Sequence, residues 1–183
     1  MRVITGIARG RKLVTLEGEE VVRPTTDRVK EAMFSIIQFD IPGKSVLDLF
    51  AGSGQLGIEA LSRGAEKAVF VDKSAEAFSV VKQNLKTCGL SDKATVINSD
   101  SFGFLRSTAE KFDIILIDPP YSRQMAETAL SLVDGVLKDG GMYYTEHSLF
   151  YPVGSGTHHF FALKSHKLTS SGYTGNNSHK ISP

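Results

Sequence analysis

Residues 46–60 read VLDLFAGSGQLGIEA, a short apolar run followed by a glycine-rich turn and the start of a helical pattern. Gly52, Gly54 and Gly57 have the Gly-x-Gly-x-x-Gly spacing of a dinucleotide-binding loop. Asp72 follows Gly52 by 20 residues, where such a loop places an acid on a ribose. The spacing alone is a weak signal, because different nucleoside cofactors can be bound by the same backbone geometry. The residues around the loop must decide between them.

Strand and helix patterns alternate on both sides of this loop. We expect a short β-arm over residues 2–16 and a helix from Pro24 to about Phe39. Strands are then predicted at 45–50, 67–72, 94–98, 112–118 and 140–146, and helices from about Gly54 to Arg63 and at 74–89, 101–107 and 122–138. This alternation predicts an α/β fold with a doubly wound, mostly parallel sheet.

The bulk composition is that of an ordinary globular protein. The chain has 183 residues, of which 41% are hydrophobic and 22% charged, and this length suits a single domain. Its one cysteine, Cys88, excludes an intrachain disulfide and a cysteine-based zinc site and suits a reducing compartment. The chain shows neither a secretory h-region nor an apolar run long enough to span a membrane. We therefore expect a cytoplasmic protein with no membrane partner.

The charge distribution is more informative than the net charge of +1. The first 12 residues contain no acid and carry four basic residues, Arg2, Arg9, Arg11 and Lys12. Such an arm can bind a phosphate backbone. The alternative is a solvated edge segment whose charges have no partner.

Three acids stand at or just after the ends of three successive predicted strands. Asp48 would repel a pyrophosphate but attract a cation such as the ammonium group of a methionine moiety. Asp72 can accept hydrogen bonds from ribose hydroxyls, and Asp100, with Ser101 beside it, from an adenine amino group. Together with the glycines, these acids indicate S-adenosylmethionine rather than NAD as the cofactor. We assign Phe50 and Lys73 to the same site.

Each acid also has a purely structural interpretation. Asp48 could be a turn residue, and Asp72 could cap the helix that begins at Ser74. Asp100 could be the N-cap of the helix over residues 101–107. Each alternative is reasonable for one acid, but it is less reasonable that all three acids have only structural roles.

The fourth predicted strand of the alternating region ends in Asp118-Pro119-Pro120-Tyr121. Proline lacks an N–H and has a fixed φ, so this segment presents carbonyl oxygens in a rigid geometry. The Asp118 carboxylate and the Pro119 carbonyl can accept the two N–H bonds of an amino group on an aromatic ring. That arrangement orients the nitrogen lone pair for attack on a methyl group. Tyr121 can stack on a base taken out of its helix. The alternative is a turn that only ends a strand.

Four segments together resemble the RsmD family of bacterial methyltransferases: RPTTDRVKEAMF, VLDLFAGSGQLGIEALSRGA, the Asp72 and Asp100 strand ends, and DPPY. The resemblance covers about residues 1–150. It implies a class I, Rossmann-like methyltransferase that uses S-adenosylmethionine to modify guanine N2 in small-subunit ribosomal RNA. It also implies that Arg23, Pro24 and Thr25 flank the cofactor and that the basic arm meets RNA. We expect a monomer that acts on an assembling subunit and needs no metal.

The tail departs from this resemblance. The family normally finishes with an antiparallel pair of strands carrying charged and aromatic residues. Here the last 37 residues contain no acid, and only HHFFALKSHKL (158–168) suggests a strand. A shifted reading frame or truncation late in the gene is one explanation, and divergence within the family is the other.

Two other functions remain open on these residues. DPPY also serves the methylation of adenine N6 or cytosine N4 in DNA, although such enzymes usually carry a target-recognition region. A catalytically impaired RNA-binding relative is the second alternative. A dinucleotide oxidoreductase is disfavoured by Asp48 and by the DPPY segment.

Overall fold

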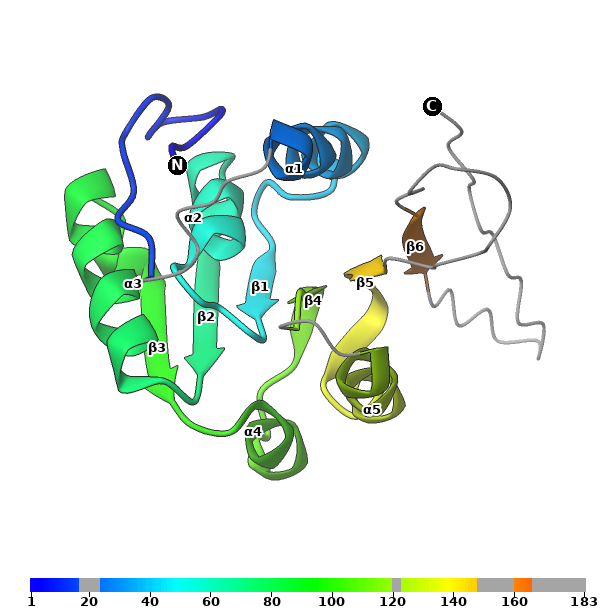
Figure 1. Cartoon of the computed structure of the whole chain (residues 1–183). Coiled ribbons are helices and arrows are strands. Elements are labelled where there is room, and N and C mark those ends of the chain that lie inside the picture. The colour runs from blue at the N-terminus through cyan, green and yellow to red at the C-terminus, as the bar shows by residue number, and fades with distance from the viewer. Residues whose placement is uncertain (17–23, 120–122, 148–159, 166–183) are drawn as a thin grey trace, which may run out of the picture.

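The structure, a computed structural model, describes residues 1–16, 24–119, 123–147 and 160–165 (Figure 1). The strands are β1 Ser45–Asp48, β2 Lys67–Asp72, β3 Ala94–Asn98, β4 Phe112–Ile117, β5 Leu137–His147 and β6 Phe160–Ser165. The helices are α1 Pro24–Ile37, α2 Gln55–Ser62, α3 Ala75–Cys88, α4 Ser101–Ser107 and α5 Arg123–Val133, with a 3₁₀ turn η1 at Ser91–Lys93. No helix in these described ranges is long and apolar enough to cross a membrane.

The strands form one sheet in the order β3-β2-β1-β4-β5-β6. The first five in this order run parallel, and β6 pairs antiparallel with β5. The predicted doubly wound sheet is therefore confirmed, as is a strand within 158–168. The chain runs from β1 outward to β3 and then returns to place β4 on the other side of β1. This reversal puts the topological switch point between β1 and β4, where ligands of open α/β sheets bind.

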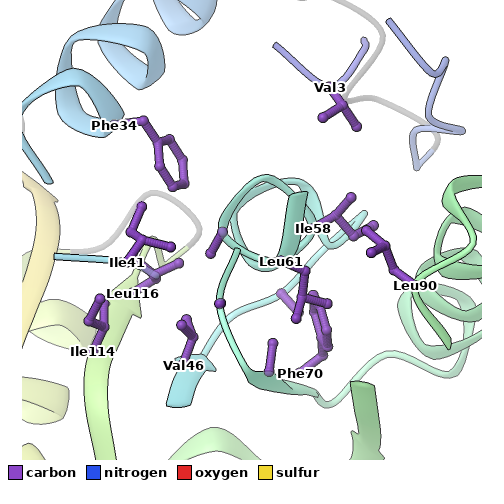
Figure 2. Packing of buried hydrophobic residues seen from close by; sticks show 14 of the residues in the cluster. Val3, Phe34, Ile41, Val46, Ile58, Leu61, Phe70, Leu90, Ile114 and Leu116 are labelled. Atoms are coloured by element: carbon purple, nitrogen blue, oxygen red, sulfur yellow. The ribbon is translucent and has the colours of Figure 1, made fainter. Parts of the chain in front are cut away.

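Helices cover both faces of the sheet (Figure 1). Alternate strand residues point to opposite faces, so each face has its own apolar cluster. One cluster joins Val46 and Phe70 to Phe34 of α1, Ile58 of α2 and Val81 of α3; Figure 2 shows part of it. The other cluster packs strand residues such as Leu47 and Ile115 against α4 and α5. Burial on both faces explains why the central strands are short and almost wholly apolar.

The N-terminal arm, here residues 1–16, is less regular than the predicted β-arm. It folds back on itself through one antiparallel bridge between Arg2 and Lys12, and no extended strand forms. Gly6 and Gly10 adopt φ values of 86° and 81°, so the chain turns between the two bridging residues. Val3 still reaches the core and belongs to the same apolar cluster as Ile58 of α2 (Figure 2).

Several predicted boundaries differ from those observed, most of all around α5 and β5. The helix expected over 122–138 ends at Val133, and β5 begins at Leu137 instead of residue 140. Between them a tight turn forms, in which the Gly135 amide donates to the Leu132 carbonyl at 3.2 Å. β1 ends at Asp48 rather than at residue 50, because the chain leaves the sheet to enter the glycine loop.

Candidate functional site

The glycine loop lies at the carboxyl end of β1 and leads into α2. Gly52 and Gly54 have φ values of 50° and 78°, in the left-handed region that favours glycine. The Gly54 amide donates to the Ala51 carbonyl at 2.6 Å and so closes a tight turn. A Cβ added at Gly57 would lie 2.3 Å from the Phe70 ring, so this third glycine lets α2 pack closely on β2.

Asp48 is buried beneath this loop, with an exposed fraction of 1%. Its Oδ2 accepts a hydrogen bond from the Gly57 amide at 2.8 Å. Gly54, the N-cap residue of α2, has no side chain that could satisfy the first-turn amides. Asp48 therefore caps α2 from the end of β1. The structural alternative considered from the sequence was a different one, a residue of a turn.

The environment of Asp48 disfavours its charged form. The pKa of Asp48 is raised to about 8: burial is the main cause, the hydrogen bond from the Gly57 amide opposes the rise, and the negative charges of Asp118 and Asp72 add to it. The same interactions show that carboxylates from the ends of β1, β2 and β4 come together. The strand-end pattern groups Asp48 and Asp72 with Asp100, whereas here the second charge that acts on Asp48 is that of Asp118.

Asp72, the last residue of β2, holds the loop from the other side. Its Oδ2 accepts from the Gly52 amide at 2.9 Å and its Oδ1 from the Ser74 amide at 2.9 Å. The N-cap of α3 is Ser74, whose hydroxyl accepts from the Ala77 amide at 3.2 Å. Asp72 is therefore not the cap of α3. It retains lone pairs, because a carboxylate offers about four acceptor sites.

Asp100 is the N-cap of α4, with its Oδ2 accepting from the Gly103 amide at 2.7 Å. The structural interpretation of this acid is therefore correct, and its exposed side chain leaves a second role open. Ser101 is 4% exposed, and its hydroxyl donates to the Leu49 carbonyl at 2.6 Å. That bond ties α4 to the end of β1.

Phe50 and Phe102 form an edge-to-face pair, with ring centroids 5.9 Å apart and planes at 70°. Phe50 follows β1, and Phe102 lies in the first turn of α4. The pair joins the start of α4 to the chain that follows β1, and both rings pack against the apolar core. Phe102 is not among the residues predicted from sequence, because its nearness to Phe50 depends on how α4 packs.

Asp118 and Pro119 follow directly after β4, beside the glycine loop. Asp48 of β1 is in register with Leu116 of β4, and the Leu49 amide donates to the Leu116 carbonyl at 3.0 Å. The Asp118 side chain is exposed and Pro119 is half-buried. The structure thus brings these two predicted residues next to the predicted cofactor loop. Pro120 and Tyr121 lie outside the described residues.

The remaining predicted residues are dispersed. Lys73 is exposed at the end of β2, and Thr25 lies in the first turn of α1. Arg23 lies outside the described residues. The four basic residues of the N-terminal arm are all exposed, and the arm runs beside α2 and α3 (Figure 1); they are Arg2, Arg9, Arg11 and Lys12.

Asn84 contacts the glycine loop and is absent from the sequence-based assignment. It is fully buried in α3, and its Nδ2 donates to the Ser53 carbonyl at 2.9 Å. A lone asparagine in a helical pattern carries no signal of this contact. Only the packing of α3 against the loop reveals it.

Comparisons with known proteins agree with this arrangement. The fold matches a solved structure titled "Putative methyltransferase yhhF from Escherichia coli" with a TM-score of 0.74 and 35% identity, covering 85% of this chain and 84% of that one. The sheet, its helices and these neighbours define a class I methyltransferase fold. The chain belongs to the family described as conserved hypothetical protein 95, the RsmD family, whose sequence model matches residues 1–174.

Curated relatives carry related names. A Bacillus subtilis (strain 168) protein named "Putative rRNA methyltransferase YlbH" is 45% identical over 152 residues, covering 80% of this chain and 82% of that protein. "Ribosomal RNA small subunit methyltransferase D" of Haemophilus influenzae is 42% identical over 151 residues, covering 80% of this chain and 78% of that protein.

Proposed function

We propose that this protein transfers a methyl group from S-adenosylmethionine to the exocyclic N2 of a guanine in small-subunit ribosomal RNA. One observation carries the proposal: the Asp118-Pro119 segment leaves β4 directly beside the glycine loop that leaves β1. This juxtaposition supports the proposal, because the segment that would bind the amine lies next to the loop that would bind the cofactor, at the switch point of the sheet. The names of the relatives from B. subtilis and H. influenzae support ribosomal RNA as the substrate class.

The donor set at the three strand ends fits S-adenosylmethionine. Asp72 has acceptor capacity for ribose hydroxyls, and Asp100 presents an exposed carboxylate beside the Phe50–Phe102 pair for an adenine. Asp48 is 1% exposed, which favours a role in holding the loop from beneath over direct contact with the methionine part. When bound, this cofactor supplies a methyl group on a positively charged sulfonium, and the carboxylates of Asp72 and Asp118 suit that charge.

Asp118 and Pro119 would position the target amine. A guanine N2 is a poor nucleophile, because its lone pair is delocalised into the ring. If its two N–H groups donate to the Asp118 carboxylate and the Pro119 carbonyl, the nitrogen is oriented and can pyramidalise toward the methyl group. The new N–CH₃ bond forms as the S–CH₃ bond breaks, and the surplus N2 proton then leaves to Asp118 or to water. Pro120 and Tyr121 would shape and stack the base.

The direct test is methyl transfer from labelled S-adenosylmethionine to small ribosomal subunits, naked ribosomal RNA and duplex DNA, followed by mass analysis of the nucleosides. We expect N2-methylguanosine from a ribosomal RNA sample. N6-methyladenine or N4-methylcytosine from duplex DNA would support the DNA alternative. Bound cofactor with no product in any sample would identify a catalytically impaired relative.

The role of Asp118 is tested by Asp118→Ala. We expect turnover to fall at least about 10²-fold, the usual cost of losing one group that stabilises a transition state. Cofactor affinity should remain close to that of the unsubstituted protein, because this carboxylate would touch the amine. Asp92→Ala removes an exposed carboxylate from η1 and is the matched control. A large loss of cofactor affinity in Asp118→Ala would contradict the assignment.

A further inference from the structure

The N-terminal arm is hydrogen-bonded to α2, the helix that begins at the glycine loop. Glu59 of α2 is 1% exposed and accepts from the Ile4 amide at 2.8 Å and the Thr5 amide at 3.0 Å. Its charge is balanced by Arg63, whose Nε donates to Glu59 Oε1 at 2.8 Å. A buried acid that accepts two arm amides and an ion pair fixes the arm at one position on the helix.

The arm also approaches the end of α2 without space for a side chain. The Ile7 amide donates to the Ser62 carbonyl at 2.9 Å, and the Ala8 amide to the Ser62 hydroxyl at 3.0 Å. A Cβ added at Gly6 would lie 1.8 Å from the Ser62 carbonyl oxygen. Only glycine permits this contact, so residue 6 controls whether the arm docks.

Asn84 connects the same arm to the glycine loop. Its Oδ1 accepts from the Val14 amide at 2.8 Å, and its Nδ2 donates to the Val14 carbonyl at 2.9 Å and to the Ser53 carbonyl at 2.9 Å. Because Asn84 is 0% exposed, water cannot replace these partners without the arm moving. One side chain therefore holds both the arm and the peptide between Gly52 and Gly54.

The conformation of that peptide depends on contacts with the rest of the protein. Ser53 stands between two glycines with positive φ, so its carbonyl has few intrinsic restraints. Besides the bond to Asn84, its hydroxyl lies 4.0 Å from the Met1 sulfur, at the start of the arm. The loop is thus held on one side by Asp72, through the Gly52 amide, and on the other by Asn84 and the arm.

We propose that the docked arm is part of the cofactor site, with Asn84 as the positioning residue that couples them. RNA bound to the basic residues of the arm favours docking, docking orders the loop, and cofactor bound to the loop favours docking in turn. The two ligands therefore strengthen each other's binding by the same factor. This inference rests on the proposed function, since it takes RNA and S-adenosylmethionine as the ligands.

The first experiment needs no RNA and uses S-adenosylhomocysteine as the probe. Its affinity is measured by titration calorimetry for the full chain, Gly6→Ala and Gly43→Ala. Gly43 precedes β1, outside the arm; both glycines have positive φ, so both substitutions strain the backbone, but nothing lies within 4 Å of a Cβ added at Gly43. We expect Gly6→Ala to weaken binding about 5- to 150-fold, the usual range of allosteric coupling, and Gly43→Ala to leave it unchanged. Equal affinities of the two variants would overturn the inference.

A second variant pair guards against misfolding of Gly6→Ala. Asn84→Ala removes all three bonds, whereas Gln83→Ala removes an exposed amide from the same helix. The readout is hydrogen exchange at the Ile7 amide, an arm amide that is bonded to Ser62 and not to Asn84, with and without S-adenosylhomocysteine. We expect the probe to slow this exchange in the unsubstituted chain and in Gln83→Ala, and to lose that effect in Asn84→Ala. A structural role alone would not make exchange in the arm depend on a ligand of the loop.

The outcomes separate the two proposals. If the unsubstituted chain does not bind S-adenosylhomocysteine, the proposed function fails and the coupling fails with it. If the probe binds but exchange at the Ile7 amide does not change, only the coupling is wrong. Coupling further requires that small-subunit ribosomal RNA raise the affinity of the unsubstituted chain for the probe. An increase of the same size in Asn84→Ala would contradict the coupling.

Discussion

The position of Asp48 at the end of a strand follows from the sequence, but its burial and its raised pKa do not. The end of a buried strand beside a glycine loop is visible in the sequence, because parallel strands end at one edge of the sheet. Its burial beneath the N-terminus of α2 is not visible, since this depends on Gly57 allowing the helix to lie against Phe70. The consequence is a carboxyl whose pKa is raised to about 8.

This raised pKa predicts a pH dependence of stability. The folded protein keeps the Asp48 proton up to about pH 8, whereas the unfolded chain loses it near the ordinary value of 3.8. The stabilising contribution is therefore complete below about pH 4 and is lost as the pH rises to about 8. Asn cannot ionise, so Asp48→Asn should remove this decline from the free energy of unfolding measured in urea. The exposed Asp92→Asn should retain it, and parallel curves for both variants would contradict the expected state of Asp48.

Gly57 should tolerate no side chain. Alanine normally stabilises a helix relative to glycine by about 1 kcal/mol. Here its Cβ would lie 2.3 Å from the Phe70 ring and 3.1 Å from Asp48 Oδ2. We expect Gly57→Ala to cost about 1–3 kcal/mol by overpacking, measured as a lower urea midpoint. Gly103→Ala in α4, where the nearest atom would be 3.4 Å away, is the control, and equal effects would argue against a tight contact at Gly57.

At the scale of elements, α4 shows that a structural role and a ligand role can share one side chain. Asp100 caps the helix through Oδ2, so its position after β3 is explained without any cofactor. The sequence left both interpretations open, and the structure establishes only the cap.

Asp100→Ser separates the two roles. Serine is as good an N-cap as aspartate, so the stability of the protein should change by less than about 0.5 kcal/mol. Its shorter, uncharged hydroxyl should not reach an adenine amino group, and affinity for S-adenosylhomocysteine should fall about tenfold or more, as for a lost hydrogen bond to a charged group. Thermal unfolding and calorimetric titration measure the two effects. Unchanged affinity would leave Asp100 with the cap alone.

The sequence predicts best the elements whose two ends are marked by neighbouring residues. β2 and β3 have the expected bounds, because each lies between a clear turn and a capped helix. The end of α5 and the start of β5 were misplaced, since Leu132, Val133, Val136 and Leu137 are apolar in a way that fits either state. The tight turn at Gly135 decides between them, and no local pattern fixed which glycine of this region would turn.

Although the net charge of the whole molecule is only +1, its N-terminal arm forms a locally basic surface. The arm is fixed to α2 and α3 by Glu59 and Asn84, and all four of its basic residues are exposed. Arg2 and Lys12 face each other across the backbone bridge of the arm. We propose this docked basic arm, on a nearly neutral protein, as the footprint of a phosphate backbone.

The salt dependence of RNA binding tests this footprint. Each phosphate contact contributes about one unit to the slope of log affinity against log salt concentration, because a counterion is released. We expect Arg9→Ala and Arg11→Ala each to lower that slope by about one unit on naked small-subunit ribosomal RNA, without changing thermal stability, since both side chains are exposed. Lys93→Ala, at an exposed position on η1 outside the arm, should keep the full slope. An equal slope in all three variants would mean that the arm's charges only face solvent and that RNA docks elsewhere on the molecule.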